Sequence, residues 1–190
     1  ARPSALGGNV PDASALVEAT KRDAMVLLAR GSLPFQAERA LWSTLDVSYF
    51  MRHDPGEIAW HTRQISRHLL HRHAQDDVLV RARLSPVGEG LQVMLYTADK
   101  IDLFARTCGY FDRSNFSIVD ARIYTTRDGH ALDTFQVITK EQPEHYRELI
   151  NLIESGLAKA VANPTLPPPR TARPSRRVRY FPVTPRLDLR

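Results

Sequence analysis

Near Gln75 the apolar residues of this chain change their spacing, and the structure that they can build changes with it. Before this point they recur every three to four positions, as on one face of a helix. After it they alternate, as Val78, Val80 and Ala82 do, which is typical of a strand with one buried face. The sequence therefore predicts a helical segment followed by a domain built on a sheet.

The helical segment is expected over residues 12–74 and should hold three helices. Gly31 follows a basic turn and stops the first helix, whereas Pro34 and Pro55 each suit the first position of a new helix. Asp54 can cap the third helix. The helices are expected from Ala13 to Arg30, from Pro34 to just before Asp46, and from Pro55 along a buried stripe of Ile58, Ile65 and Leu69, with "VSYFM" as a link before the third.

The second module is expected over residues 77–184 and reads strand, strand, helix, strand, strand, helix, strand. Without its leading strand this order is βαββαβ, the ferredoxin-like arrangement of four antiparallel strands with both helices on one face. A proline-rich connector, residues 163–174, precedes the last strand, "RRVRYFPV". The predicted fold class is α+β: an N-terminal helical segment, then a ferredoxin-like domain with an extra leading strand.

The stretch "SIVDARIYTTRDGHALDTFQV", residues 117–137, predicts a hairpin. A three-residue loop, Arg127 to Gly129, with Gly129 left-handed, would set Thr125 opposite Ala131 and Ala121 opposite Phe135. A two-residue turn would shift the register by one and match apolar side chains less well. One face should then hold Val119, Ala121, Ile123, Phe135 and Val137, and the other Ile118, Asp120, Arg122 and Tyr124. Asp133 must find hydrogen bonds or lie at the rim.

Composition limits the cellular location and the binding partners that we expect for the chain. No apolar run is long enough to span a membrane, the start resembles no secretory signal, and a single cysteine, Cys108, excludes an internal disulfide. A cytoplasmic location is expected. The net charge of +5 comes mostly from the residues 170–190, where seven arginines face one acid, Asp188. We interpret that stretch as a solvated segment and expect no nucleic-acid partner.

Three motifs resemble catalytic signatures, but each has a simpler structural interpretation. Gly31-Ser32 with Asp46 lacks the second carboxylate that a nucleotidyltransferase metal needs, because Ser48 stands in its place. Pro55 makes Asp54 extended, which favours a helix cap over a His53-Asp54 metal pair. The remaining motif, a basic helix end, contains His61, His68, His71 and His73. We therefore expect neither catalytic residues nor a metal or cofactor site in this chain.

Three strings carry a resemblance to a known family. "DLFARTCGYFDRSNFSIVDARIYTTRDGHALDTFQV" resembles the first of two ACT domains in the bifunctional uridylyltransferase/uridylyl-removing enzymes that modify the PII nitrogen-signalling protein. "YFMRHDPGEIAWHTR" resembles the segment ahead of that domain, and "RRVRYFPV" its closing strand. The resemblance runs from about Tyr49 to Val183 and implies an ACT domain over residues 77–184.

The resemblance also implies a regulatory function. In this family L-glutamine is the effector, PII is the substrate, and Mg²⁺ serves catalytic domains that this chain lacks; a second ACT copy is the expected partner domain. Ile101-Asp102 replace the usual Pro-Gly of the ligand loop. The alternative to ligand binding is that Asp102 is only a helix cap and Asp120 is only a surface residue. The ligand-binding residues implied by the resemblance are Asp99, Lys100, Ile101, Asp102, Asn115, Ser117, Ile118 and Asp120.

A second hypothesis needs no ligand. Ile118, Tyr124 and Leu132 are predicted on the sheet face without helices, where an apolar surface could pair with another ACT domain or dock PII.

Overall fold

The computed structural model describes residues 12–71, 77–139, 145–163 and 178–180. The chain divides into two compact units, Ala1–Leu70 and His71–Arg190, which are described separately below and are called unit 1 and unit 2. Within the described ranges, no helix combines the length and the apolar character needed to cross a lipid bilayer.

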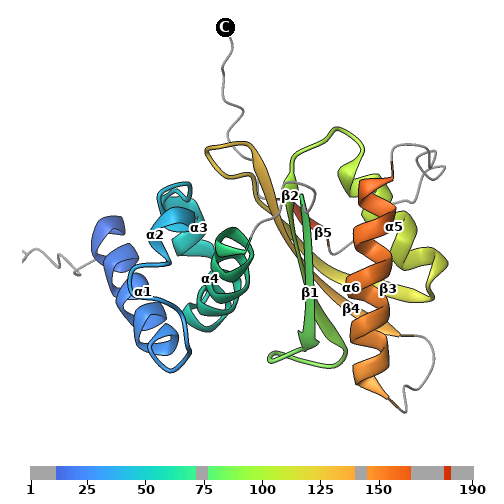
Figure 1. Ribbon diagram of the computed structural model, residues 1–190, viewed down its shortest axis with the longest axis horizontal. Coiled ribbons are helices and arrows are strands. Elements are labelled where there is room, and N and C mark those ends of the chain that lie inside the picture. The colour runs from blue at the N-terminus through green and yellow to red at the C-terminus, as the bar shows by residue number, and fades with distance from the viewer. Residues whose placement is uncertain (1–11, 72–76, 140–144, 164–177, 181–190) are drawn as a thin grey trace, which may run out of the picture. The chain divides into compact units, whose positions relative to one another are not determined.

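The described part of unit 1 consists of four helices (Figure 1). Two of them, α1 and α4, are long and pack against each other. Asp12 caps α1 by accepting the N–H of Ser14, and Asp54 accepts the N–H of Glu57 at 2.9 Å, which confirms Asp54 as a cap. The helices span Ala13–Leu28 (α1), Arg39–Trp42 (α2), Val47–Arg52 (α3) and Pro55–Leu70 (α4).

The predicted second helix and the "VSYFM" link are wrong. Gln36 has φ +63°, a left-handed conformation, so a helix cannot run on from Pro34, and only the short α2 forms. The link forms α3 instead, because Asp46 accepts the N–H of Tyr49 at 3.3 Å and thereby caps a helix whose Tyr49 and Phe50 side chains are buried. Burial and capping make this stretch a helix. It has too few residues for the spacing of its apolar side chains to show a helical period.

Unit 2 is a five-stranded sheet with α5 and α6 on one face (Figure 1), and this confirms the predicted α+β class. Its core joins sheet residues such as Val93 and Phe135 to Phe111 of α5 and Leu157 of α6. The order across the sheet is β1-β2-β4-β3-β5. The elements are β1 (Val78–Leu84), β2 (Leu91–Ala98), α5 (Leu103–Arg113), β3 (Phe116–Ile123), β4 (His130–Thr139), α6 (Tyr146–Ala162) and β5 (Val178–Tyr180).

The leading strand and the last strand lie at opposite edges of the sheet. In a ferredoxin-like sheet the last strand pairs antiparallel with the first strand of the βαββαβ series, which here is β2. Here β1 takes that place and pairs antiparallel with β2. A hydrogen bond also joins β1 to α6, because the N–H of Ala82 donates to the carboxylate of Glu154 at 3.0 Å. Strand β5 pairs parallel with β3 instead, so the expectation of a fourth antiparallel strand from "RRVRYFPV" is wrong for its described residues.

The hairpin between β3 and β4 has the predicted register near its turn. Thr125 lies opposite Ala131, Ala121 lies opposite Phe135, and Gly129 is left-handed with φ +81°. The register then shifts between Ile118 and Asp120.

This shift is a β-bulge, and it changes which side chains face the helices. An extra residue in one strand reverses the alternation beyond it. Ile118 therefore packs against the core of unit 2 instead of lying on the opposite face, which corrects the predicted assignment. Tyr124 and Leu132, predicted to be exposed, are 4% and 0% exposed.

Candidate ligand-binding site

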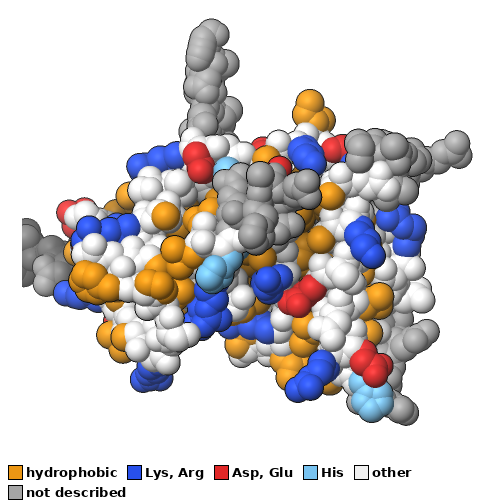
Figure 2. All heavy atoms as spheres, in the orientation of Figure 1, with side chains coloured by type: hydrophobic (Ala, Val, Ile, Leu, Met, Phe, Trp, Pro, Cys, Tyr) orange, Lys and Arg blue, Asp and Glu red, His pale blue; other side chains and the backbone are white. Residues whose placement is uncertain are grey.

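Four of the predicted ligand-binding residues lie together in the loop between β2 and α5. The N–H of Asp99 donates to the carbonyl of Gly129 at 3.0 Å, and that of Leu103 donates to the carbonyl of Lys100 at 3.2 Å. These bonds fix both ends of the loop. Ile101 is fully exposed at its tip. Hydrophobic side chains reach the visible surface at several separate places in Figure 2, so the exposure of Ile101 alone marks no site.

Asp102 occupies the N-cap position of α5, but its carboxylate does not cap the helix. It accepts from Nε of Arg106 instead, and this hydrogen bond lowers the pKa of Asp102 below its usual value. Nη1 of Arg106 also donates to the carbonyl of Asn163 at 2.8 Å. Arg106 therefore ties the loop to the end of α6, and a ligand ammonium would have to compete with it for Asp102.

The other four predicted residues lie at the opposite end of α5. Asn115 follows that helix in a left-handed conformation with φ +62°, and Ser117, Ile118 and Asp120 belong to β3. Eleven helical residues separate the two groups by about 16 Å. The structure of a single chain therefore does not bring all eight residues to one place.

Two buried polar side chains lie on the helix-bearing face of the sheet, near the loop. Thr97 is 1% exposed, and among the residues that the structure describes its hydroxyl has no hydrogen-bond partner. Asp133 is 2% exposed, and its Oδ1 accepts the N–H of Tyr124 at 3.3 Å. The sequence signal for Asp133 was its position on the apolar side of an alternating strand, whereas nothing in the sequence marked the hydroxyl of Thr97.

Burial determines the chemistry of Asp133. It raises the pKa of this carboxyl to about 8, the N–H of Tyr124 works against the rise, and the negative charge of Asp99 adds to it. At neutral pH Asp133 is therefore mostly a carboxylic acid, which offers one O–H donor and one carbonyl acceptor. Together with the hydroxyl of Thr97 it suits a neutral polar group better than a charged one.

Comparison with known proteins identifies relatives of this chain. A family profile described as "Uridylyltransferase GlnD fifth domain" matches residues 12–64. Bifunctional uridylyltransferase/uridylyl-removing enzymes from Burkholderia thailandensis, Burkholderia mallei and Burkholderia pseudomallei are each 49% identical over 97% of this chain. The chain covers 21% of the length of these relatives. No solved structure shows a significant match.

The class of protein follows from the fold: a helical unit joined to an α+β domain of the ACT-like, ferredoxin type. The particular family follows from the comparisons. The chain belongs to the family of bifunctional uridylyltransferase/uridylyl-removing enzymes, and it corresponds to about a fifth of their length.

Proposed function

We propose that this chain is a regulatory segment of a bifunctional uridylyltransferase/uridylyl-removing enzyme, and that unit 2 senses L-glutamine. The observation that carries the proposal is the pair of buried polar groups, Thr97 and Asp133, near a loop that also holds Asp99 and Lys100. The 49% identity over 97% of the chain supports the assignment to that enzyme. The PII protein is then the substrate of the whole enzyme, and Mg²⁺ belongs to catalytic domains outside this chain.

The chemistry of glutamine complements these groups. Its side-chain amide has one carbonyl acceptor and two N–H donors, which match the protonated carboxyl of Asp133 and the hydroxyl of Thr97. Its ammonium suits Asp99, and its carboxylate suits Lys100 and the N–H groups of the first turn of α5. Glutamate would bring a second negative charge toward Asp99 and into the buried surroundings of Asp133, where an ionised group is costly, and this disfavours it.

Ligand binding would reach the rest of unit 2 through Arg106. This residue joins Asp102 of the loop to Asn163 at the end of α6, so a ligand that moves the loop also moves the contact between the two helices. A coupling free energy of about 1 to 3 kcal/mol is typical of such regulation. Because a second ACT copy is expected to complete the site, the single domain should bind about a hundredfold more weakly than a pair, at roughly 3 kcal/mol of lost contacts.

Calorimetric titration tests the proposal directly. L-glutamine is titrated into this chain and into a longer polypeptide that continues through the second ACT domain, with L-glutamate and L-asparagine as competitors. We expect saturable binding of glutamine, tighter in the longer polypeptide and about tenfold weaker in Thr97→Val and Asp99→Asn, as expected for one lost hydrogen bond or charge contact. Asp112→Asn, an exposed carboxylate at the far end of α5, is the control and should bind normally. Absence of binding in both polypeptides would overturn the proposal.

The alternative, a docking surface that needs no ligand, was based on the predicted exposure of three apolar residues, and the structure does not show this exposure. Tyr124 and Leu132 are buried and Ile118 packs into the core of unit 2, so these three residues do not form an exposed apolar patch.

A further inference from the structure

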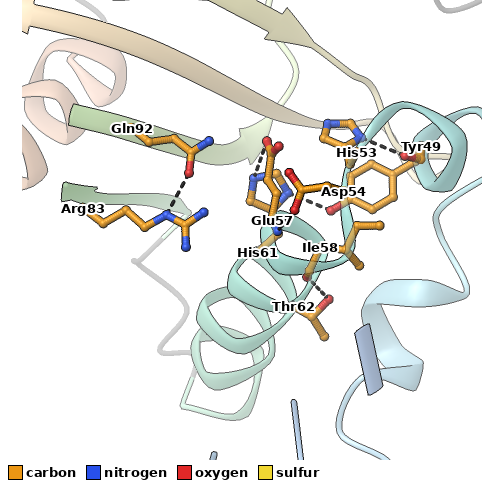
Figure 3. Close-up of polar contacts among 9 residues, drawn as sticks. All are labelled: Tyr49, His53, Asp54, Glu57, Ile58, His61, Thr62, Arg83 and Gln92. Carbon is orange, nitrogen blue, oxygen red and sulfur yellow. Dashed lines mark hydrogen bonds and ion pairs between the residues drawn. The ribbon is translucent and has the colours of Figure 1, made fainter. Parts of the chain in front are cut away.

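Three metal-ligating side chains meet at the corner between α3 and α4 in unit 1 (Figure 3). His53 directly follows α3, and Glu57 and His61 lie one turn apart on α4. One ligand atom from each lies within 4.8 Å of the other two. All three side chains are buried, with exposures of 5%, 2% and 0%. The cluster belongs to unit 1, whereas the ligand loop belongs to unit 2.

The hydrogen bond of His53 fixes which of its ring nitrogens carries the proton. Its Nδ1 lies 2.8 Å from the carbonyl oxygen of Tyr49, and a carbonyl oxygen can only accept. Nδ1 therefore carries the proton, and in the neutral ring Nε2 carries the lone pair that binds a metal. Orientation of a metal-binding imidazole by a backbone carbonyl is a common arrangement around protein metal ions.

His61 is held in a similar way by the hydroxyl of Tyr49, whose oxygen lies 2.7 Å from Nδ1. The other ring nitrogen, Nε2, is 3.5 Å from Oε1 of Glu57. Tetrahedral zinc with bonds of about 2.0 to 2.1 Å sets neighbouring ligand atoms roughly 3.3 Å apart. The Glu57–His61 pair already has nearly this spacing, so small side-chain rotations of His53 would complete a three-ligand site.

We propose that His53, Glu57 and His61 bind a divalent transition-metal ion, and that zinc is the ion of choice. Two imidazoles and one carboxylate are a ligand set that zinc accepts, with a water molecule in the fourth position. The metal would join the end of α3 to the first two turns of α4 and so stabilise unit 1. Without metal, Nε2 of His61 and Oε1 of Glu57 face each other at 3.5 Å in a buried place, where the desolvation of polar groups is costly.

The structure selects a different set of ligands from those that the sequence motifs suggested. Asp54 caps α4 and is not a member, and His71, in the histidine-rich helix end, is exposed. The signal in the sequence is the spacing of His53, Glu57 and His61, each four residues from the next. The expectation of no metal site assigned His53 and His61 to two separate motifs and did not consider Glu57.

Metal analysis of the whole 190-residue chain tests the proposal. The tag-free chain is stripped with EDTA, dialysed against Zn²⁺ and assayed for metal by mass spectrometry, and its affinity is measured by competition with a chromogenic chelator. We expect one tightly bound zinc ion per chain and a higher melting temperature with zinc than without. Substitution by Co²⁺ should give the visible absorption of a four-coordinate site.

Matched variants locate the ion. Glu57→Gln keeps the size and the hydrogen-bonding capacity of the side chain, and we expect it and His61→Gln to lower zinc affinity by at least about a hundredfold. Tyr49→Phe, which removes the partner of His61, should lower it about ten- to a hundredfold. His71→Gln is the control and should bind zinc normally. Failure of the parent chain to bind one zinc ion, or normal binding by both Glu57→Gln and His61→Gln, overturns the proposal. Because the glutamine site belongs to unit 2, this result is independent of the proposed function.

Discussion

Thr97 and Asp133 lie diagonally across the pairing of β2 with β4, on the face of the sheet that packs against α5 and α6. Thr97 is opposite Ala131 and Leu95 is opposite Asp133, so the two polar side chains are diagonal neighbours on one face. Both are buried beside an apolar cluster that includes Leu95 and Phe135. Buried polar groups in such a place reduce stability, so their presence favours a functional role.

The first prediction concerns Asp133 and pH. Its pKa is about 8 in the folded chain and 3.8 as an unperturbed group, so between these values the folded state holds a proton that the unfolded state releases. The free energy of unfolding should therefore fall as pH rises from about 4 to 8, by at most about 1.4 kcal/mol per pH unit, and the slope from this group should vanish outside that range. Urea unfolding at pH 5, 6, 7 and 8 measures this slope.

Asp133→Asn isolates the contribution of this carboxyl. Asparagine has nearly the same shape, can still accept the N–H of Tyr124 and does not ionise. The variant should be more stable than the parent chain near pH 8, and the difference should shrink toward pH 5. Asp112→Asn, at an exposed position of α5, should leave the slope unchanged. A parallel pH dependence in the parent chain and Asp133→Asn would show that Asp133 is ionised in the folded state.

The second prediction concerns the hydroxyl of Thr97. Replacing this buried, unpartnered hydroxyl by a methyl group in Thr97→Val removes a desolvated polar atom at nearly constant shape, and should raise the free energy of unfolding by about 1 kcal/mol. Thr107→Val is the matched control, because the hydroxyl of Thr107 is buried and donates to the carbonyl of Leu103 at 2.8 Å. The control should lose about 0.5 to 1.5 kcal/mol. Equal losses in both variants would mean that Thr97 is satisfied in the folded chain.

The elements that the sequence predicted well depend on local signals. The hairpin register follows from the three-residue loop Arg127 to Gly129, where Gly129 supplies the left-handed conformation that the loop needs. Helix α6 follows from the helical spacing of Tyr146, Leu149, Ile150, Ile153 and Leu157 in the sequence. Both signals are contained within a few residues of the element that they specify, so no knowledge of the rest of the fold was required.

The features that the sequence did not predict depend on distant contacts. The placement of β5 beside β3, at the edge of the sheet away from β2, is a choice between two sheet edges, which alternation within a strand cannot decide. The bulge after Ile118 has no glycine to mark it. In the candidate site, Asp133 was recognisable as an unusual carboxylate, but its proximity to Thr97 required the pairing of β2 with β4.

The third prediction concerns the contact between α5 and α6. A Cβ atom added at Gly156 would lie 2.5 Å from the hydroxyl oxygen and 2.8 Å from a ring carbon of Tyr110, whose hydroxyl donates to the carbonyl of Leu152 at 3.0 Å. Gly156→Ala should therefore lower the free energy of unfolding by about 1 to 3 kcal/mol, although alanine is the better helix former. Thermal unfolding checks this. Ser155→Ala, exposed on the same helix, should change stability little, and Tyr110→Leu combined with Gly156→Ala should recover part of the loss. A stabilising Gly156→Ala would show that the helices lie further apart than described.

The last prediction concerns Cys108, the chain's single thiol. It lies in α5 with 8% of its surface exposed, and burial raises its pKa to about 11. The reactive species is the thiolate, so at pH 8 only about one thiol in a thousand is ionised in the folded chain. The reaction with Ellman's reagent at pH 8 should therefore be at least about a hundredfold slower in buffer than in urea, where the thiol is exposed and its pKa returns to about 8.5. One thiol per chain should react in urea, and Cys108→Ala should abolish the signal in both conditions. A fast reaction of the folded chain would mean that α5 opens readily from the sheet, which would also make the loop before it a less ordered ligand site.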